Sequence, residues 1–255
     1  MLTPIGQVEA LFRYPVKSMA GEQLGAADLG WNGLKGDRRL AFRRVDDHSE
    51  VPWLTASKLP DLIRYVPLRH QSDDNGADAD LPTHIRTPEG KELRVFGRDR
   101  SKDLGEDLAK EVGRRYRAPV EMMQLRNGIF DEACISVIAT DTVSEIARLA
   151  GVSPDVRRFR PNIVVRLLQP APFQEDQWLG GVLSFGEQDD APAIIVTQRD
   201  VRCSMLNLDP DAARPTPEVL KAVVRVNQNH AGIYGGITRT GILAVGQRVF
   251  FEAGS

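Results

Sequence analysis

The chain has 255 residues, of which 42% are hydrophobic, and this is enough apolar material for a packed core. It excludes a peptide, a disordered tail and a fibrous chain. The 33 Lys and Arg residues are balanced by 35 Asp and Glu residues, which gives a net charge of −2 at pH 7. This balance argues against the broad positive field that binding to nucleic acid or to an anionic membrane requires. Any anion-binding site must therefore be local.

The sequence shows neither a targeting signal nor the cysteines of a disulfide framework. No stretch approaches the roughly 20 apolar residues that span a bilayer, and the first residues lack the basic and apolar blocks of a secretory signal. We therefore expect a cytoplasmic protein. Its two cysteines, Cys134 and Cys203, cannot build a disulfide framework or a four-cysteine metal site. In a reducing compartment each thiol stays free unless it has a chemical task.

Short β-rich segments dominate the chain. Apolar residues alternate between positions 8 and 14, as in a half-buried strand. Further strands are predicted where β-branched and aromatic residues lie between Gly, Pro or charged clusters. These runs are 40–45, 135–138, 163–168, 193–197 and 242–251.

Three helices are predicted between the strands. Residues 103–112 carry an apolar stripe at helical spacing, and a helix opens near residue 216. Thr142 and Glu145 have the spacing of a capping box before a segment that stops at Gly151. With 22 Gly, 16 Pro and no βαβ rhythm, the pattern favours a mainly β, α+β fold built on β-barrels.

Two polar stretches suggest how the chain is divided. Residues 71–80 cannot bury apolar area and predict a solvated loop, and residues 97–102 form a second charged break. We therefore predict an N-terminal β-barrel-like domain over residues 1–100 and a second β-barrel domain over residues 101–255.

Two turns in the first half combine glycine or proline with basic side chains. The turn at 14–21 carries Lys17 and Ser18, which together with backbone N–H groups would form an anion pocket, although such a pair is also typical of a solvated turn. The turn at 33–39 ends in Arg38 and Arg39, which should face opposite ways at the start of a strand. One of them would point toward a ligand, or both would be surface charges.

A third segment places three arginines directly before a buried strand. Pro161 predicts an extended backbone at Arg160, and a cation entering a core needs a partner. That partner is either the pair Glu175 and Asp176 or an anionic ligand held at the strand entrance.

The fourth segment, residues 199–210, places Cys203 directly after Arg202. A neighbouring guanidinium favours the thiolate, which is the form that attacks or binds soft metals, whereas a free cysteine is otherwise an inert core residue. The inert interpretation suits Cys134, which lies in an apolar run. None of the four histidines stands in a catalytic or zinc-binding signature.

Taken in order along the chain, these motifs resemble those of the MOSC family, named for the C-terminal domain of molybdenum cofactor sulfurase. The resemblance extends from about residue 5 to about residue 251. It is strongest to the two-part members, the mitochondrial amidoxime-reducing component and its bacterial relatives, in which an N-terminal MOSC β-barrel domain precedes the MOSC domain. The motifs are Tyr-Pro-Val-Lys-Ser, Gly-Asp-Arg, Arg-Phe-Arg-Pro-Asn-Ile-Val-Val, Glu-Asp-x-Trp, Arg-Cys with a following Asp-Pro, and Gly-Ile-Leu-Ala-Val-Gly.

The resemblance implies a cofactor and a set of site residues. Cys203 takes the role of the protein ligand to molybdenum and of the catalytic residue. The residues implied to contact the molybdopterin cofactor, or to line its pocket, are Lys17, Ser18, Arg38, Thr55, Arg160, Asn162 and Arg202.

The implied activity is reduction of small N-hydroxylated substrates by oxygen-atom transfer, with the cofactor as the redox centre. Electrons would come from a separate donor protein, since no ferredoxin-like cysteine cluster is present. Two alternatives stay open. One is a molybdenum cofactor carrier or a sulfur relay through a Cys203 persulfide, and the other is a pyridoxal phosphate-binding protein in which Lys17 forms the Schiff base.

Overall fold

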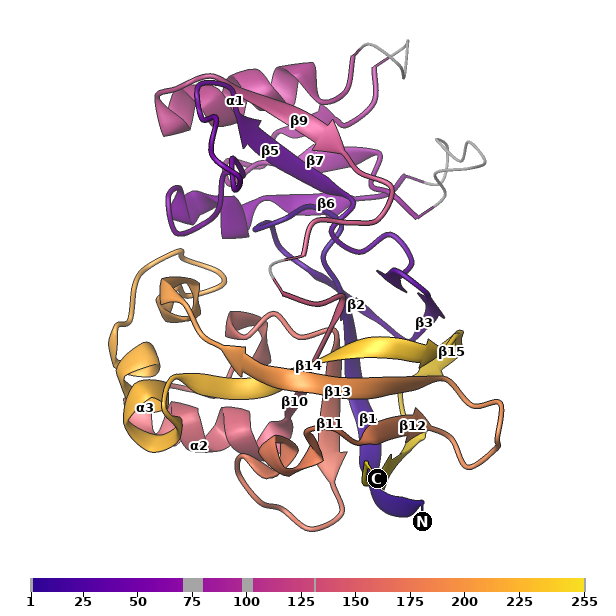
Figure 1. Cartoon of the computed structure of the whole chain (residues 1–255). Helices are drawn as coiled ribbons and strands as arrows, with labels where there is room; N and C mark the ends of the chain where they lie inside the picture. The colour runs from indigo at the N-terminus through magenta and orange to yellow at the C-terminus, as the bar shows by residue number, and fades with distance from the viewer. Residues whose placement is uncertain (1, 71–79, 98–102, 131, 255) are drawn as a thin grey trace.

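The computed structural model describes residues 2–70, 80–97, 103–130 and 132–254, and it consists of a barrel and a smaller body stacked on it (Figure 1). The predicted polar loop at 71–80, apart from Asp80, lies outside the described residues. The predicted boundary near residue 100 lies outside them too. Both ends of the described chain lie at the far end of the barrel, away from the smaller body (Figure 1).

Seven strands of the described residues close into the barrel, which confirms the predicted mainly β fold. Six neighbouring pairs run antiparallel, and β10 and β11 run parallel. The interior is filled by buried aliphatic side chains and by Trp178 and Phe185. In order around the barrel the strands are β1 (Thr3–Arg13), β11 (Ile163–Leu167), β10 (Ile135–Ala139), β14 (His230–Arg239), β13 (Ala193–Val201), β12 (Val182–Phe185) and β16 (Arg248–Glu252). An eighth strand, β2 (Glu22–Leu24), pairs with the C-terminal end of β1.

A β-bulge in β1 changes which side chains face the barrel interior. The register against β11 shifts between Val8 and Ala10. Val8 and Leu11 therefore pack in the interior, whereas Ala10 and Phe12 pack on the outer face against the helices. Beyond Phe12 the strand leads directly into the turn that carries Lys17.

Two helices, α2 (Thr140–Ala150) and α3 (Glu218–Asn227), cover that outer face (Figure 1). The capping box predicted at Thr142 is wrong, because α2 begins two residues earlier and has no side-chain cap. The Thr142 hydroxyl instead donates to Glu175 at 2.9 Å, in the short helix η5 (Gln174–Trp178). Burial raises the pKa of Glu175 to about 7.

The smaller body has its own hydrophobic core. It contains the helix α1 (Glu106–Tyr116), the short helix η1 (Pro60–Arg64), a two-stranded sheet and a three-stranded sheet. Residues from both sides of position 100 contribute to both bodies. The two-stranded sheet of the smaller body contains one strand from before residue 100 and one from after it, and the barrel contains β1. The sheets are β5 (Leu40–Arg44) with β9 (Val120–Gln124), and β6 (Val66–Leu68) with β7 (His84–Arg86) and β8 (Glu92–Arg94).

A third small sheet lies beside the barrel and consists of β15 (Gly241–Ala244), β3 (Ala26–Gly30) and β4 (Gly33–Leu34). The run predicted as one strand at 242–251 is thus two strands, β15 and β16, separated by a turn in which Gly246 has a φ of 86°. Within the described part of the chain, no helix combines the length and the apolar composition needed to cross a membrane.

Candidate functional site

A cavity of about 330 Å³ is lined by seven of the eight site residues expected from the sequence. They come from turns at the ends of elements that are far apart in the chain. The turn after β1 meets the segment before β5, the loop before η1, and the segments that follow η4 (Val156–Arg158) and β13. The seven residues are Lys17, Ser18, Arg38, Thr55, Arg160, Arg202 and Cys203.

The turn after β1 holds a nearly buried cation. Lys17 is 5% exposed, and its backbone N–H donates to the carbonyl of Leu40 at 2.8 Å, which fixes the turn against β5. Its Nζ lies 3.5 Å from the carbonyl oxygen of Ile129. Ser18 is also buried, and its hydroxyl lies 3.9 Å from the Met205 sulfur. The sequence pair therefore lines a cavity and is not a solvated surface turn.

Arg38 is held in place by several acceptors. Its backbone N–H donates to the carbonyl of Tyr14 at 2.7 Å, and its Nη2 donates to the carbonyl of Arg160 at 3.1 Å. The guanidinium also forms an ion pair with Asp37 and lies 4.9 Å from the centre of the Tyr14 ring. Arg39 donates to the carbonyl of Leu125 instead. Of the two neighbouring arginines, Arg38 is thus the one that lines the cavity.

Asn162, the eighth expected residue, lies behind the cavity wall and does not line it. It is 1% exposed, and its Oδ1 accepts the Ser136 backbone N–H at 3.2 Å. Its Nδ2 donates to Asp37 at 3.1 Å. Asp37 is itself buried, and it also accepts the Tyr14 backbone N–H at 2.6 Å. Asn162 and Asp37 therefore form a buried polar layer that supports Arg38.

Arg160 adopts a conformation that the sequence analysis did not anticipate. Pro161 predicts an extended backbone, but Arg160 has a φ of 52°. Tertiary contacts stabilise this geometry: Nη1 donates to the Met19 carbonyl at 2.6 Å, and the guanidinium lies 4.2 Å from the centre of the Tyr14 ring. The carbonyl of Arg160 is the acceptor for Arg38.

In the described structure the two preceding arginines pair with carboxylates other than Glu175 and Asp176, contrary to that alternative. Arg157 donates to both carboxylate oxygens of Asp211 at 2.8 Å, and Arg158 donates to Asp209 at 3.1 Å. Glu175 and Asp176 lie on η5 at the barrel and have other partners. The arginines thus bind the loop that follows Cys203.

Cys203 lies where β13 ends and the short helix η6 (Ser204–Asn207) begins. It is solvent-exposed and belongs to the same cavity wall as Lys17 and Arg38. The guanidinium of Arg202 is turned inward, toward Asp200 at 2.8 Å and the carbonyls of Ala231 and Phe159. Arg202 therefore anchors the segment that presents the thiol.

Cys134 differs from Cys203 in its surroundings. It is partly buried, and its sulfur lies 3.8 Å from the carbonyl of Gly235. Burial raises the pKa of the Cys134 thiol. This environment agrees with the inert interpretation.

Several polar residues of the site were missed by the sequence analysis. Asp200 is 2% exposed, and burial raises its pKa to about 6 even though Arg202 lies beside it. The Ser136 hydroxyl donates to Asp200 at 3.2 Å, and Tyr234 also hydrogen-bonds to it. Asp200 stands within the segment that contains Cys203, so its position could have drawn attention. Tyr234, on β14, stands in no motif.

Three of the lining residues have left-handed backbone conformations, with φ values of 65° at Ser18, 48° at Arg38 and 52° at Arg160. Such angles are uncommon outside glycine, and they persist only where the surrounding structure compensates for the cost. Each of the three belongs to a turn in which side chains are presented to the cavity. The turns at this site are thus specified by tertiary contacts as well as by local preference.

Comparisons with known proteins agree with this architecture. The family model for the MOSC domain matches residues 106–250. Mitochondrial amidoxime reducing component 2 from Bos taurus is 25% identical over 98% of this chain and 84% of its own length. The crystal structure of the YuaD protein from Bacillus subtilis superposes with a TM-score of 0.52 at 15% identity and full coverage of both chains, which supports a shared fold. Because the family model matches more than half of this chain, the chain belongs to the MOSC domain family.

Proposed function

We propose that the protein is a molybdenum-dependent reductase of small N-hydroxylated compounds, in which Cys203 is the protein ligand to the metal. The observation that carries this proposal is the convergence of Lys17, Arg38 and Arg160 around one exposed thiol in a single cavity. The similarity to an amidoxime reducing component supports the same reaction class.

The residues present fit a molybdopterin cofactor. A pterin dithiolene that carries a phosphate is anionic, and this cavity is lined by four arginines and Lys17. The Nε of Arg158 is buried and has no hydrogen-bond partner among the described residues. A thiolate is a soft ligand suited to molybdenum. No group of three or more His, Cys, Asp or Glu side chains in the described chain could hold a metal, so the other ligands would come from the cofactor.

Each part of the cavity then has a distinct task. Lys17 and Ser18 would bind the phosphate, with Lys17 as a buried point charge. Arg38 would contact the pterin from a position fixed by Asp37, and Thr55 would close the cavity from the smaller body. When bound, the cofactor supplies two electrons that, with two protons, convert an N–OH group into N–H and water. A separate electron-donor protein would reduce it again.

Metal content and activity test this proposal together. We would express the protein anaerobically with the cofactor and measure molybdenum per chain and benzamidoxime reduction with a reduced artificial donor. The parent and Cys134→Ser should carry stoichiometric metal and turn over. Cys203→Ser should lose both the metal and the activity. Equal rates in the parent and Cys203→Ala would refute the mechanism.

The exposure of Cys203 supports a second candidate function, a cofactor carrier or a sulfur relay. A persulfide must be open to attack by an acceptor thiol, and an exposed cysteine meets that requirement. Cyanide-releasable sulfur on Cys203 without stable molybdenum would favour this candidate. A Schiff-base absorbance band that disappears in Lys17→Ala would instead favour pyridoxal phosphate.

A further inference from the structure

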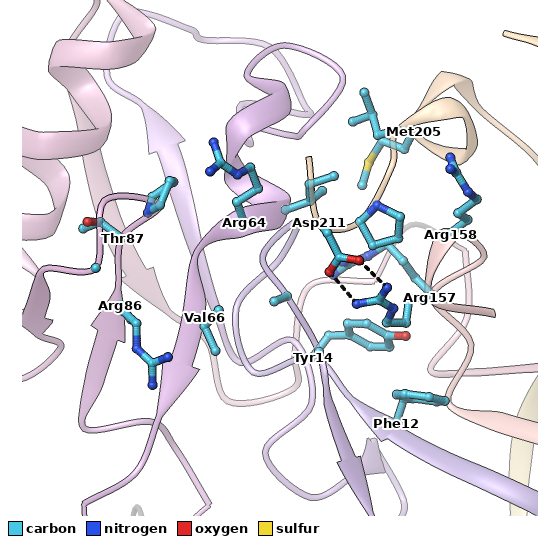
Figure 2. A pocket seen from close by; sticks show the side chains of 18 residues that line it. Phe12, Tyr14, Arg64, Val66, Arg86, Thr87, Arg157, Arg158, Met205 and Asp211 are labelled. Atoms are coloured by element: carbon cyan, nitrogen blue, oxygen red, sulfur yellow. Dashed lines mark hydrogen bonds and ion pairs between the residues drawn. The ribbon is translucent and has the colours of Figure 1, made fainter. Parts of the chain in front are cut away.

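A second cavity, of about 450 Å³, lies where the barrel meets the smaller body (Figure 2). One wall comes from the end of β1 and from the segments around Arg157 and Asp211, and the other comes from η1, β6 and β7. Arg158, Arg160 and Met205 line both this cavity and the one at Cys203. Of the eight expected site residues only Arg160 lines it, whereas Lys17, Arg38 and Cys203 do not, so it is a neighbouring cavity that shares one wall with the first.

The middle of this cavity is apolar. Phe12 and Tyr14 contribute aromatic surface from the barrel, and Ile63 and Val66 contribute aliphatic surface from the smaller body. Figure 2 shows Tyr14 and Val66 on facing sides, beneath the Arg157–Asp211 ion pair. Apolar walls of this kind bind the body of a small ligand, while a few polar groups orient it.

The charged groups of the lining are mostly cationic. The lining holds five arginines and a single carboxylate, Asp211, which already accepts two hydrogen bonds from Arg157. Arg64 pairs with the Asp61 carboxylate at 3.5 Å, and its side chain is 34% exposed. Two further polar groups, the Tyr14 hydroxyl and Arg158 Nε, are buried without a partner in the described structure. The walls therefore combine cationic side chains with an apolar centre.

We propose that this cavity is a second binding site, for a small flat amphipathic anion that has an apolar ring system and one carboxylate. The ring would lie between Phe12, Ile63 and Val66, and the carboxylate would accept from Arg64 at the entrance. Such a ligand would bridge the barrel and the smaller body. Because Arg158, Arg160 and Met205 form part of both cavities, an occupied second cavity would also restrain the wall of the Cys203 cavity.

Calorimetric titration with 2-naphthoate tests this inference, and the uncharged 2-naphthamide serves as the matched ligand control. We expect 2-naphthoate to bind at one site at least tenfold more tightly than the amide. Arg64→Gln should weaken naphthoate binding about fivefold to tenfold, which corresponds to about 1 kcal/mol. Val66→Trp should block it by filling the cavity. Arg248→Gln, which removes an exposed arginine on β16, should leave it unchanged.

Lys17→Ala separates the two cavities, because Lys17 lines only the one at Cys203. We expect it to leave naphthoate affinity unchanged. Three results would overturn the inference: no binding at millimolar naphthoate, equal affinity for naphthoate and naphthamide, or loss of binding in Lys17→Ala with retention in Val66→Trp. None of these results depends on molybdenum content, so the proposed reductase function stands or falls separately.

Discussion

Asp37 is the acceptor on which the wall of the Cys203 cavity depends, and Asp37→Ala is the substitution that tests this role. The carboxylate is 1% exposed and accepts from the Arg38 guanidinium, the Tyr14 backbone N–H and the Asn162 side chain. In Asp37→Ala the backbone N–H of Tyr14 loses the carboxylate that accepts its hydrogen bond. Arg38 keeps the Arg160 carbonyl but loses its countercharge.

The expected loss of stability follows from this geometry. Removing one partner of a buried ion pair costs about 3–5 kcal/mol, since the remaining charge stays desolvated. Asn162 retains the Phe12 carbonyl as an acceptor at 3.3 Å, so we expect a loss of about 4 kcal/mol. For a chain of this size, this corresponds to a melting temperature lower by roughly 10 °C.

Urea denaturation followed by circular dichroism measures the loss, and Asp61→Ala is the control. Asp61 is 40% exposed and pairs with Arg64 and Arg115 at 3.5 and 3.4 Å, so its removal should cost less than about 1 kcal/mol. Asp37→Asn keeps an oxygen acceptor without the charge and should fall between the two. A loss in Asp37→Ala no larger than that in Asp61→Ala would refute the reasoning.

Three further predictions concern buried groups. Burial raises the pKa of Asp200 to about 6, so between about pH 4 and pH 6 the native carboxyl retains its proton while the unfolded chain releases it. The free energy of unfolding should therefore fall as the pH rises through this window, by on the order of 2 kcal/mol. Urea midpoints at pH 4.5 and pH 7 should differ less in Asp200→Asn than in the parent, and an identical pH dependence would contradict this. Tyr14→Phe should melt at or above the parent temperature, because the buried hydroxyl has no partner in the described structure, and a clear decrease would show that it has one. Trp178→Ala should lower the free energy of unfolding by about 3–5 kcal/mol, because it leaves a cavity in the barrel core. Trp31 is 68% exposed, so Trp31→Ala should change the urea midpoint little. Similar losses in both variants would be inconsistent with the core assignment.

Much of the fold and of the candidate site could be predicted because the relevant signals are local. Alternating and continuous apolar runs marked the strands β1, β5, β10, β11 and β13 close to their observed positions. The motifs around Lys17, Arg38 and Cys203 lie in turns, and the order of these motifs along the chain was sufficient to expect a common cavity. Whether these residues bind the cofactor stays a prediction.

The features that were not predicted depend on contacts distant in sequence. The left-handed backbone of Arg160 is stabilised by Met19 and Tyr14, which override the local effect of Pro161. The Thr142 hydroxyl is used by Glu175, more than thirty residues away, and therefore does not cap its helix. The contributions of Asp37 and Tyr234 appear only when β1, β5 and β14 are assembled.

The closure of the barrel has a consequence for folding during synthesis. β1 leaves the ribosome first among the barrel strands, yet its neighbours in the finished ring are β11 and β16, and Thr3 pairs with Phe251. Its pairing with β16 must wait until nearly the whole polypeptide has been translated, whereas the strands of the smaller body are all present once β9 has been made. We therefore expect the smaller body to form first, with β1 exposed meanwhile to mispairing or to chaperones.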